Sequence, residues 1–264
     1  IINHEDVRRM LMFQKSITEA SRAMIAFSYY CMDIAENTTD ENERKLAKAY
    51  IEVNIPIVKA WCSDMAFLSI SEAMQCYGGY GFSEEYPIAQ QLRDCRIYPI
   101  WEGTNYIQSM DLIGRKWMMG GGQVFVTWLG EIEKFVQANK ANAAFAPQVA
   151  LLEEAVNNYK EIQATMAGYL GQGKLGMIGF YATRILHATG YIYGAKLLLE
   201  QALICQKKAD EIGKDNFEYP FYFGKVASAK FFCHNILPTV GTILRVIKEG
   251  DNSIMEAPEA TFTI

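Results

Sequence analysis

The sequence has few of the residues from which metal sites and disulfide frameworks are built. Its 264 residues include three histidines and six cysteines. No two cysteines form a CxxC pair, and no group of cysteines and histidines has the spacing of a zinc site. We therefore expect no metal, and we expect the cysteines to be buried, reduced thiols of a cytoplasmic protein.

Long apolar runs and runs of like charge are also missing. Polar residues interrupt every apolar stretch well before the roughly 18 positions that a membrane-spanning helix needs, so no span is expected. The formal net charge is −5, and lysine and arginine are not clustered, which argues against a nucleic-acid partner. The chain begins without methionine and enters a helical pattern at once, so a fragment of a longer protein is expected.

No segment of useful length alternates apolar and polar residues as a β-strand does, so the predicted class is all-α. Pro56 is expected to kink one helix of the first half or divide it in two, and Gly78 and Gly79 should end that helix. Thr104 or Asn105 should cap a later one. The helices expected in this half span residues 5–36, from 38 or 40 to 77, 87–93 and 106–118.

Three successive glycines, Gly120 to Gly122, mark the expected boundary between two domains, residues 1–119 and 120–264. Beyond them, apolar periodicity predicts a four-helix bundle. Its helices should span residues 124–139, 148–170, 175–212 and 221–249. The third of these contains glycines that weaken it but permit close helix packing, namely Gly176, Gly179, Gly190 and Gly194. The tail, residues 251–264, should be extended and pinned by Met255 and Phe262 if at all.

Residues 75–108 stand out because they combine glycines, prolines and a lone carboxylate among apolar and aromatic neighbours. Gly78, Gly79 and Gly81 would let the backbone approach a ligand closely, or they could form a plain helix-ending turn. The stretch is not a P-loop, and it is not a dinucleotide fingerprint because a helix precedes it. Arg93 and Asp94 are expected to form a local ion pair.

Glu102 is the only charged residue between Arg96 and Asp111, and it follows Trp101. Burial beside a tryptophan would strengthen this carboxylate as a general base, and Gly103 would leave room for a substrate. The alternative is a solvent-facing or helix-capping glutamate. The histidines are far apart in the sequence, so structural or surface roles are expected for His4, His187 and His234.

In their order and spacing, three segments of this stretch resemble the C-terminal helical domain of the acyl-CoA dehydrogenases. They read QCYGGYGFSEEYP from Gln75, LRDCRI from Leu92 and IWEGTNYIQ from Ile100. The resemblance covers residues 1–119. The segments from His4, Ile107 and Phe221 are similar to the larger members typified by 3-methylmercaptopropionyl-CoA dehydrogenase, which carry an additional C-terminal helical domain, here residues 120–264.

The resemblance implies FAD-dependent α,β-dehydrogenation of an acyl-CoA thioester in a homodimer or homotetramer that passes electrons to an electron-transfer flavoprotein. Glu102 falls on the catalytic base, and its backbone N–H would polarise the thioester carbonyl. Residues at substrate-binding positions are Trp101, Glu102 and Gly103. Residues at FAD-contacting positions are Gln75, Cys76, Tyr77, Gly78 and Gly79, commonly serving a neighbouring subunit, and Gly103, Thr104 and Asn105.

The sequence also departs from the family pattern. Trp101 stands where a tyrosine is usual, and Tyr106 stands where many members have a glutamine that contacts FAD. The family's N-terminal helical domain, its β-domain and the first helix of its C-terminal domain have no counterpart here, so the chain alone is expected to be inactive. A related flavin oxidase and a non-catalytic helical assembly module are the alternatives; Glu102 argues against nitroalkane-oxidising relatives, which have aspartate there.

Overall fold

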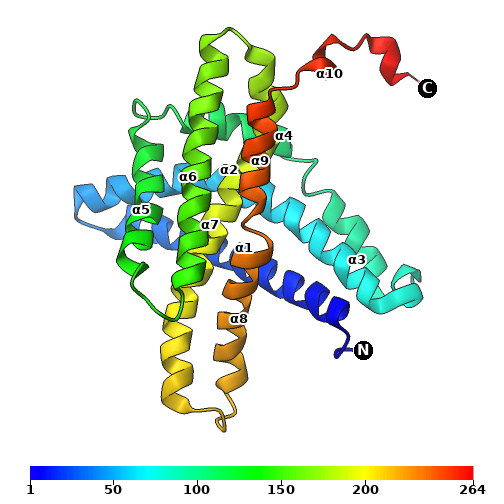
Figure 1. The fold of residues 1–264 in the computed structure, drawn as a ribbon, viewed down its shortest axis with the longest axis vertical. Coiled ribbons are helices and arrows are strands. Elements are labelled where there is room, and N and C mark those ends of the chain that lie inside the picture. Colours follow the sequence, from blue (N-terminus) through cyan, green and yellow to red (C-terminus); the bar gives the residue numbers. More distant parts are fainter. Residues whose placement is uncertain (264) are drawn as a thin grey trace.

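Two groups of helices make up the computed structural model, which describes residues 1–263 and has no β-strand in that range (Figure 1). The first group comprises α1 (Glu5–Asn37), α2 (Glu41–Tyr77), α3 (Pro87–Arg96) and α4 (Asn105–Met110). The second comprises α5 (Gln123–Asn139), α6 (Ala146–Gly171), α7 (Leu175–Ile212), α8 (Tyr219–Asn235) and α9 (Thr239–Glu249). The prediction of an all-α fold is confirmed.

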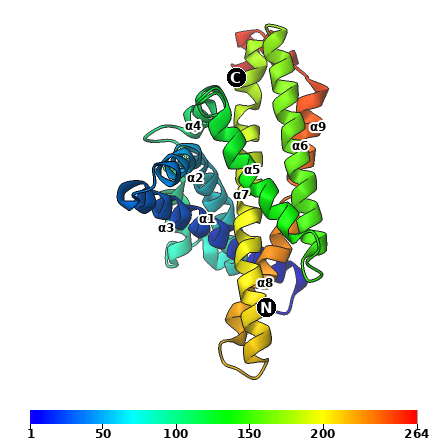
Figure 2. The same ribbon diagram turned by 90° about the vertical axis from the view of Figure 1, so that its left-hand side faces the viewer.

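The two groups lie side by side, with α1 and α2 crossing the long axis of the second group (Figures 1 and 2). Helix α1 pairs with α2 in antiparallel fashion. Asp40 begins α2 because its carboxylate accepts hydrogen bonds from the backbone N–H groups of Asn42 and Glu43, at 2.8 and 3.4 Å. The second group forms the expected bundle, in which α7 contacts helices of both groups.

Helix α2 continues through Pro56, so of the two expected outcomes, a kink or a division of the helix, the division does not occur. Proline removes one backbone hydrogen bond, but Val53 and Ile57 on either side are fully buried, and their packing holds the helix across the gap. Near Pro238, by contrast, the single helix expected over residues 221–249 is divided into α8 and α9.

The helix after Thr104 also differs from the expected regular α-helix. It is α-helical in α4 and then widens into a π-helical segment, η2 (Asp111–Lys116). The widened turn places Lys116 in the interior, only 1% exposed, where its ammonium forms ion pairs with Glu52 and, at 3.6 Å, with Asp111. A buried ammonium needs such carboxylate partners.

The glycines of α7 allow close helix packing, as the sequence predicts. A Cβ added to Gly190 would overlap the indole ring of Trp61, a fully buried residue of α2. A Cβ on Gly194 would lie 3.1 Å from Phe232 of α8. Because α2 and α8 both contact α7 in this way, one apolar core runs through both groups of helices.

A buried polar bridge crosses the same interface. The amide of Asn54 on α2 donates a hydrogen bond to the hydroxyl of Tyr193 on α7 at 3.0 Å. Its oxygen accepts one from the indole N–H of Trp128 on α5 at 3.1 Å. Asn54 is fully buried, so these partners compensate its lost hydration and fix how α2 lies against α5 and α7.

The tail is not extended as expected. It forms two short turns, α10 (Ser253–Glu256) and a 3₁₀ turn η3 (Glu259–Phe262), while Ile264 lies outside the described residues. The Asp251 carboxylate accepts a hydrogen bond from the Ser253 N–H at 3.0 Å, which favours the first turn. Met255 lies beside Gly176 of α7, whereas Phe262 is 64% exposed.

All six cysteines are free, and four of them are buried; Cys62 and Cys76 are only partly exposed. Burial raises the pKa of Cys62 to about 11 and that of Cys233 to about 12, so both remain thiols near neutral pH. Among the helices within residues 1–263, none has the length and apolar character needed to cross a membrane.

Candidate active site

The candidate base, Glu102, lies in the loop between α3 and α4. The Asn105 N–H donates to the carbonyl of Pro99 at 3.0 Å and closes this loop at its base. Glu102 has φ +47° and is the one non-glycine residue with positive φ within residues 1–263. An L-residue in this region carries strain of about 1–2 kcal/mol, and such strain persists only where the surroundings enforce it.

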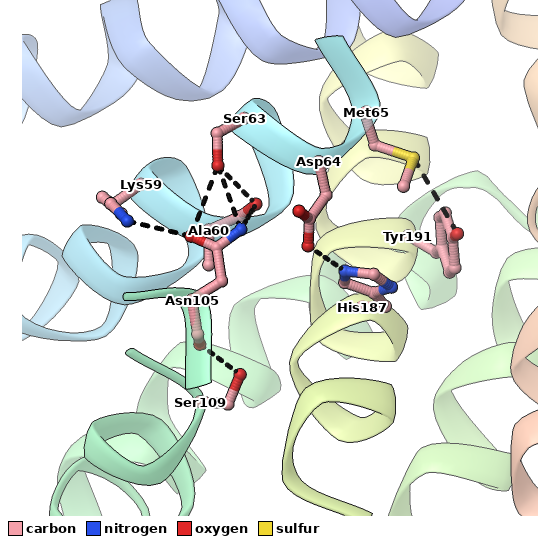
Figure 3. Close-up of polar contacts among 9 residues, drawn as sticks. All are labelled: Lys59, Ala60, Ser63, Asp64, Met65, Asn105, Ser109, His187 and Tyr191. Carbon is pink, nitrogen blue, oxygen red and sulfur yellow. Dashed lines mark hydrogen bonds and ion pairs between the residues drawn. The ribbon is translucent and has the colours of Figure 1, made fainter. Parts of the chain in front are cut away.

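Asn105 is the residue that fixes this loop to α2 (Figure 3). Its side-chain oxygen accepts hydrogen bonds from the Lys59 ammonium at 2.9 Å and the Ser63 hydroxyl at 3.4 Å. Its amide donates to the carbonyl of Ala60 at 3.1 Å and to the Ser63 hydroxyl at 3.1 Å. We call this set the Asn105 clamp. Because Asn105 is only 7% exposed, its amide is occupied by α2 and is turned away from solvent.

The charged neighbours of the clamp connect it to α7. Burial lowers the pKa of Lys59, and nearby Asp64 offsets part of that shift. Asp64 itself contacts His187 of α7 at 2.8 Å between carboxylate and ring nitrogen, and Figure 3 shows this pair beside the clamp. Sequence reasoning did not link Lys59 or Ser63 to the loop, because their four-residue spacing marks only a shared face of α2.

Glu102 and Trp101 are exposed, so in this chain the carboxylate is solvent-facing, the alternative to burial beside the indole. Trp101 is 51% exposed and Glu102 is also exposed. The reason is that the loop lies on the surface of the described chain and its apolar residues point outward. The predicted cap is confirmed, because the Thr104 hydroxyl accepts from the Ile107 N–H at 3.4 Å. Gly103, with φ +82°, continues the tight turn beside Glu102, but the side-chain amide of Gln108 fills the space at its Cβ position that is expected to admit a substrate.

The segment Gln75–Gly79 ends α2, with Gly78 at φ +61°. The positions that a Cβ would take on Gly78 and Gly79 have no atom within 4 Å, so the backbone there is open to an approaching group. Gln75 and Tyr77 are exposed, and Cys76 accepts a weak contact from the Gln14 amide at 3.8 Å. This geometry suits both a helix-ending turn and a backbone cradle.

The structure does not bring the two halves of residues 75–108 together. Gly78, which directly follows the last residue of α2, lies fifteen residues after Ser63 of the clamp, and this corresponds to about 22 Å of helix. Helix α3 then returns the chain toward α4 (Figure 1). The predicted Arg93–Asp94 ion pair is wrong: Arg93 contacts Glu84 at 3.1 Å and thereby holds the loop before α3.

The histidines do not form a site. His187 contacts Asp64, and His234 contacts Gln148 at 2.8 Å in a different part of the bundle. Within residues 1–263, no group of three or more histidine, cysteine, aspartate or glutamate side chains is arranged to hold a metal ion.

Replacing Asn105 by alanine should destabilise the chain by about 2 kcal/mol, because three partners on α2, two of them buried, lose a hydrogen bond. Those partners are Lys59, Ala60 and Ser63. Denaturant unfolding monitored by circular dichroism would measure the change. Asn37→Ala is the matched control, since that exposed amide bonds only within its own helix and should change stability by less than about 0.5 kcal/mol. Equal effects of the two substitutions would contradict the clamp.

Both halves of the chain match known protein families. Residues 1–117 match the family described as acyl-CoA dehydrogenase, C-terminal domain, and residues 128–258 match the one described as acetyl-CoA dehydrogenase C-terminal like. A butyryl-CoA dehydrogenase of Syntrophomonas wolfei is 42% identical over 99% of this chain and 43% of its own length. A 3-methylmercaptopropionyl-CoA dehydrogenase of Ruegeria pomeroyi is 32% identical over 97% of this chain and 43% of its own length.

A solved structure shares the fold. The Bacillus anthracis acyl-CoA dehydrogenase complexed with FAD superposes with a TM-score of 0.67 at 20% identity, over 92% of this chain and 42% of that one. The chain thus spans less than half the length of the relatives it matches. Since the two family matches follow one another along nearly the whole sequence, the chain belongs to the acyl-CoA dehydrogenase family, to whose C-terminal region it corresponds.

Proposed function

We propose that the natural full-length protein is an FAD-dependent acyl-CoA dehydrogenase in which Glu102 is the catalytic base. The observation that carries this proposal is the strained backbone of Glu102 in a loop closed by Asn105 and Pro99. Strain of this kind gathers at functional sites because the surrounding structure enforces it. The match to butyryl-CoA dehydrogenases points to an acyl-CoA thioester as the substrate.

The residues of this chain fit FAD in two places. The open glycine backbone of Gln75–Gly79 can approach a cofactor closely, and the loop residues Gly103 and Thr104 can line a flavin beside Glu102. Bound FAD supplies the acceptor for the hydride that leaves the β-carbon of the substrate. Since about 22 Å of α2 separates the two places, we assign Gln75–Gly79 to the FAD of a neighbouring subunit. The Asn105 amide is bonded to α2 and its backbone N–H to Pro99, so we assign Asn105 to holding the loop that lines the flavin, without a polar contact of its own.

In this proposal, the Glu102 carboxylate removes the proton from the α-carbon of the thioester. Its own N–H donates a hydrogen bond to the thioester carbonyl and stabilises the negative charge that develops there. Trp101 and Gly103 flank the acyl group. Exposure of Glu102 and Trp101 in this chain fits a base that becomes desolvated when substrate, flavin and the remaining domains cover the loop.

We infer the domain organisation, the oligomeric state and the electron acceptor from the same family relationship. Residues 1–119 and 120–264 form two domains that are joined at Gly120–Gly122 and share the apolar core described above. The protein is a homodimer or homotetramer, since Gln75–Gly79 serves a second subunit, and it transfers electrons to an electron-transfer flavoprotein in the cytoplasm.

Anaerobic titration of the purified full-length protein with butyryl-CoA tests the proposal. We expect the protein to be yellow and its visible flavin absorbance to bleach as the substrate is oxidised. A series of straight-chain acyl-CoA thioesters would then define the preferred chain length. A colourless protein, or a flavin that none of these thioesters reduces, would reject the function.

A further inference from the structure

The first turn of α4 rests directly on α7 of the second group of helices. The hydroxyl of Tyr106 lies against Gly179, so that a Cβ added to this glycine would be 2.5 Å from that oxygen and 3.7 Å from the ring carbon that bears it. Tyr106 follows the clamp residue Asn105 directly and is four residues from Glu102. The contact therefore joins the loop that carries the base to a helix whose sequence lies beyond the triple glycine.

Two further contacts join the same helix to the far side of the clamp. His187 contacts Asp64, and Gly190 receives the ring of Trp61, both on the α2 segment that holds Asn105. Gly179, His187 and Gly190 are spaced by eight and three residues, so they share one face of α7. This face thus touches the loop through Tyr106 and also touches the α2 segment to which the loop is bound.

We propose that α7 positions the catalytic loop, with Tyr106 as the positioning residue and Gly179 as the position that receives it. The proposal rests on the function assigned to Glu102 above. The Asn105 clamp holds the loop toward α2, and the packing of Tyr106 on Gly179 holds it toward α7. Displacing one of these supports shifts Glu102 relative to the substrate α-carbon. Small misplacements lower the rate of the chemical step more than they weaken substrate binding.

The distances suggest a pair of compensating substitutions. Gly179→Ala places a methyl group against the Tyr106 hydroxyl, so either the ring, which is 51% exposed, turns aside or α4 moves away from α7. Both responses remove the packing that holds the loop toward α7. Tyr106→Phe removes that hydroxyl, and the nearest ring atom then lies at an ordinary contact distance of 3.7 Å from the added methyl group. The double variant should therefore regain the packing that Gly179→Ala loses.

In the full-length enzyme, we expect Gly179→Ala to lower kcat on the order of tenfold with little change in KM. Tyr106→Phe should lose about twofold, because only the hydroxyl contact is removed, and the double variant should match Tyr106→Phe. Gly176→Ala is the matched control: it lies on the same helix, and its added methyl would meet only the end of Met255, at 3.6 Å. Equal rates for Gly179→Ala and Gly176→Ala, or no recovery in the double variant, would overturn the proposal.

Hydrogen–deuterium exchange separates this proposal from the assigned activity. Amides of residues 97–104 should exchange several-fold faster in Gly179→Ala than in the wild type, and the double variant should restore the wild-type rate. This result would support positioning by α7 even if the wild type oxidised no acyl-CoA, an outcome that would reject only the proposed function. Unchanged exchange in Gly179→Ala would refute the positioning role.

Discussion

Glu102→Gln is expected to lower acyl-CoA-dependent flavin reduction in the full-length protein by at least about 10³-fold, while flavin remains bound. Glutamine keeps the size of the side chain and the backbone N–H that would polarise the thioester, but it cannot accept the α-proton. The loss should therefore appear in the rate constant for flavin reduction, measured by anaerobic stopped flow. The substrate concentration that gives half the maximal rate, taken from the same stopped-flow measurements, should change little.

A second substitution at this position separates chemistry from backbone strain. Glu102 has φ +47°, a conformation that glycine adopts without steric cost. Glu102→Gly should therefore be as stable as the wild type or up to about 1 kcal/mol more stable, since relief of strain outweighs the entropy of glycine. It should nevertheless be as inactive as Glu102→Gln. More than a few per cent of wild-type activity in either variant would show that another residue is the base.

Gly190→Ala is expected to destabilise the chain by about 3 kcal/mol or more, the largest effect that we expect from a single added methyl group. The new Cβ would overlap the indole ring of Trp61, which is fully buried between α2 and α7. Because the ring is fully buried in the core, we expect the helices to separate to admit the methyl group. For a chain of this size, the melting temperature should fall by about 6–12 °C.

Gly168→Ala on α6 is the control for this experiment. The position is exposed, and no atom lies within 4 Å of the added Cβ. Alanine has the higher helix propensity, so this variant should be more stable by up to about 1 kcal/mol. If Gly190→Ala melted within a degree of Gly168→Ala, the close approach of α2 and α7 at Trp61 would be wrong.

Local signals in the sequence predicted much of the fold. Apolar periodicity located the long helices, Gly78 and Thr104 marked a helix end and a cap, and the glycines of α7 indicated close packing. The errors arose where distant contacts decide the outcome. The π-helical turn exists where Lys116 reaches Glu52, and Arg93 pairs with Glu84 rather than with the adjacent Asp94. Neither contact follows from the adjacent residues.

The candidate site was predicted from the joint order and spacing of its motifs. No single motif would have been enough to predict it. The sequence could not indicate that the Asn105 amide binds α2, because its partners lie more than forty residues earlier in the chain. It also could not indicate the exposure of Glu102, since burial depends on what covers the loop. The family resemblance identified the candidate residues, and the structure shows which contacts hold them in place.

The bridge between Asn54 and Tyr193 joins residues that are 139 positions apart in the chain. During synthesis at 5–20 residues per second, α2 must wait roughly 7 to 28 s for its partner on α7 to leave the ribosome. Throughout that interval, Trp61 and the apolar face around it lack the helix that later covers them. The nascent chain therefore exposes this apolar face early in its synthesis, and such a face favours aggregation until α7 covers it.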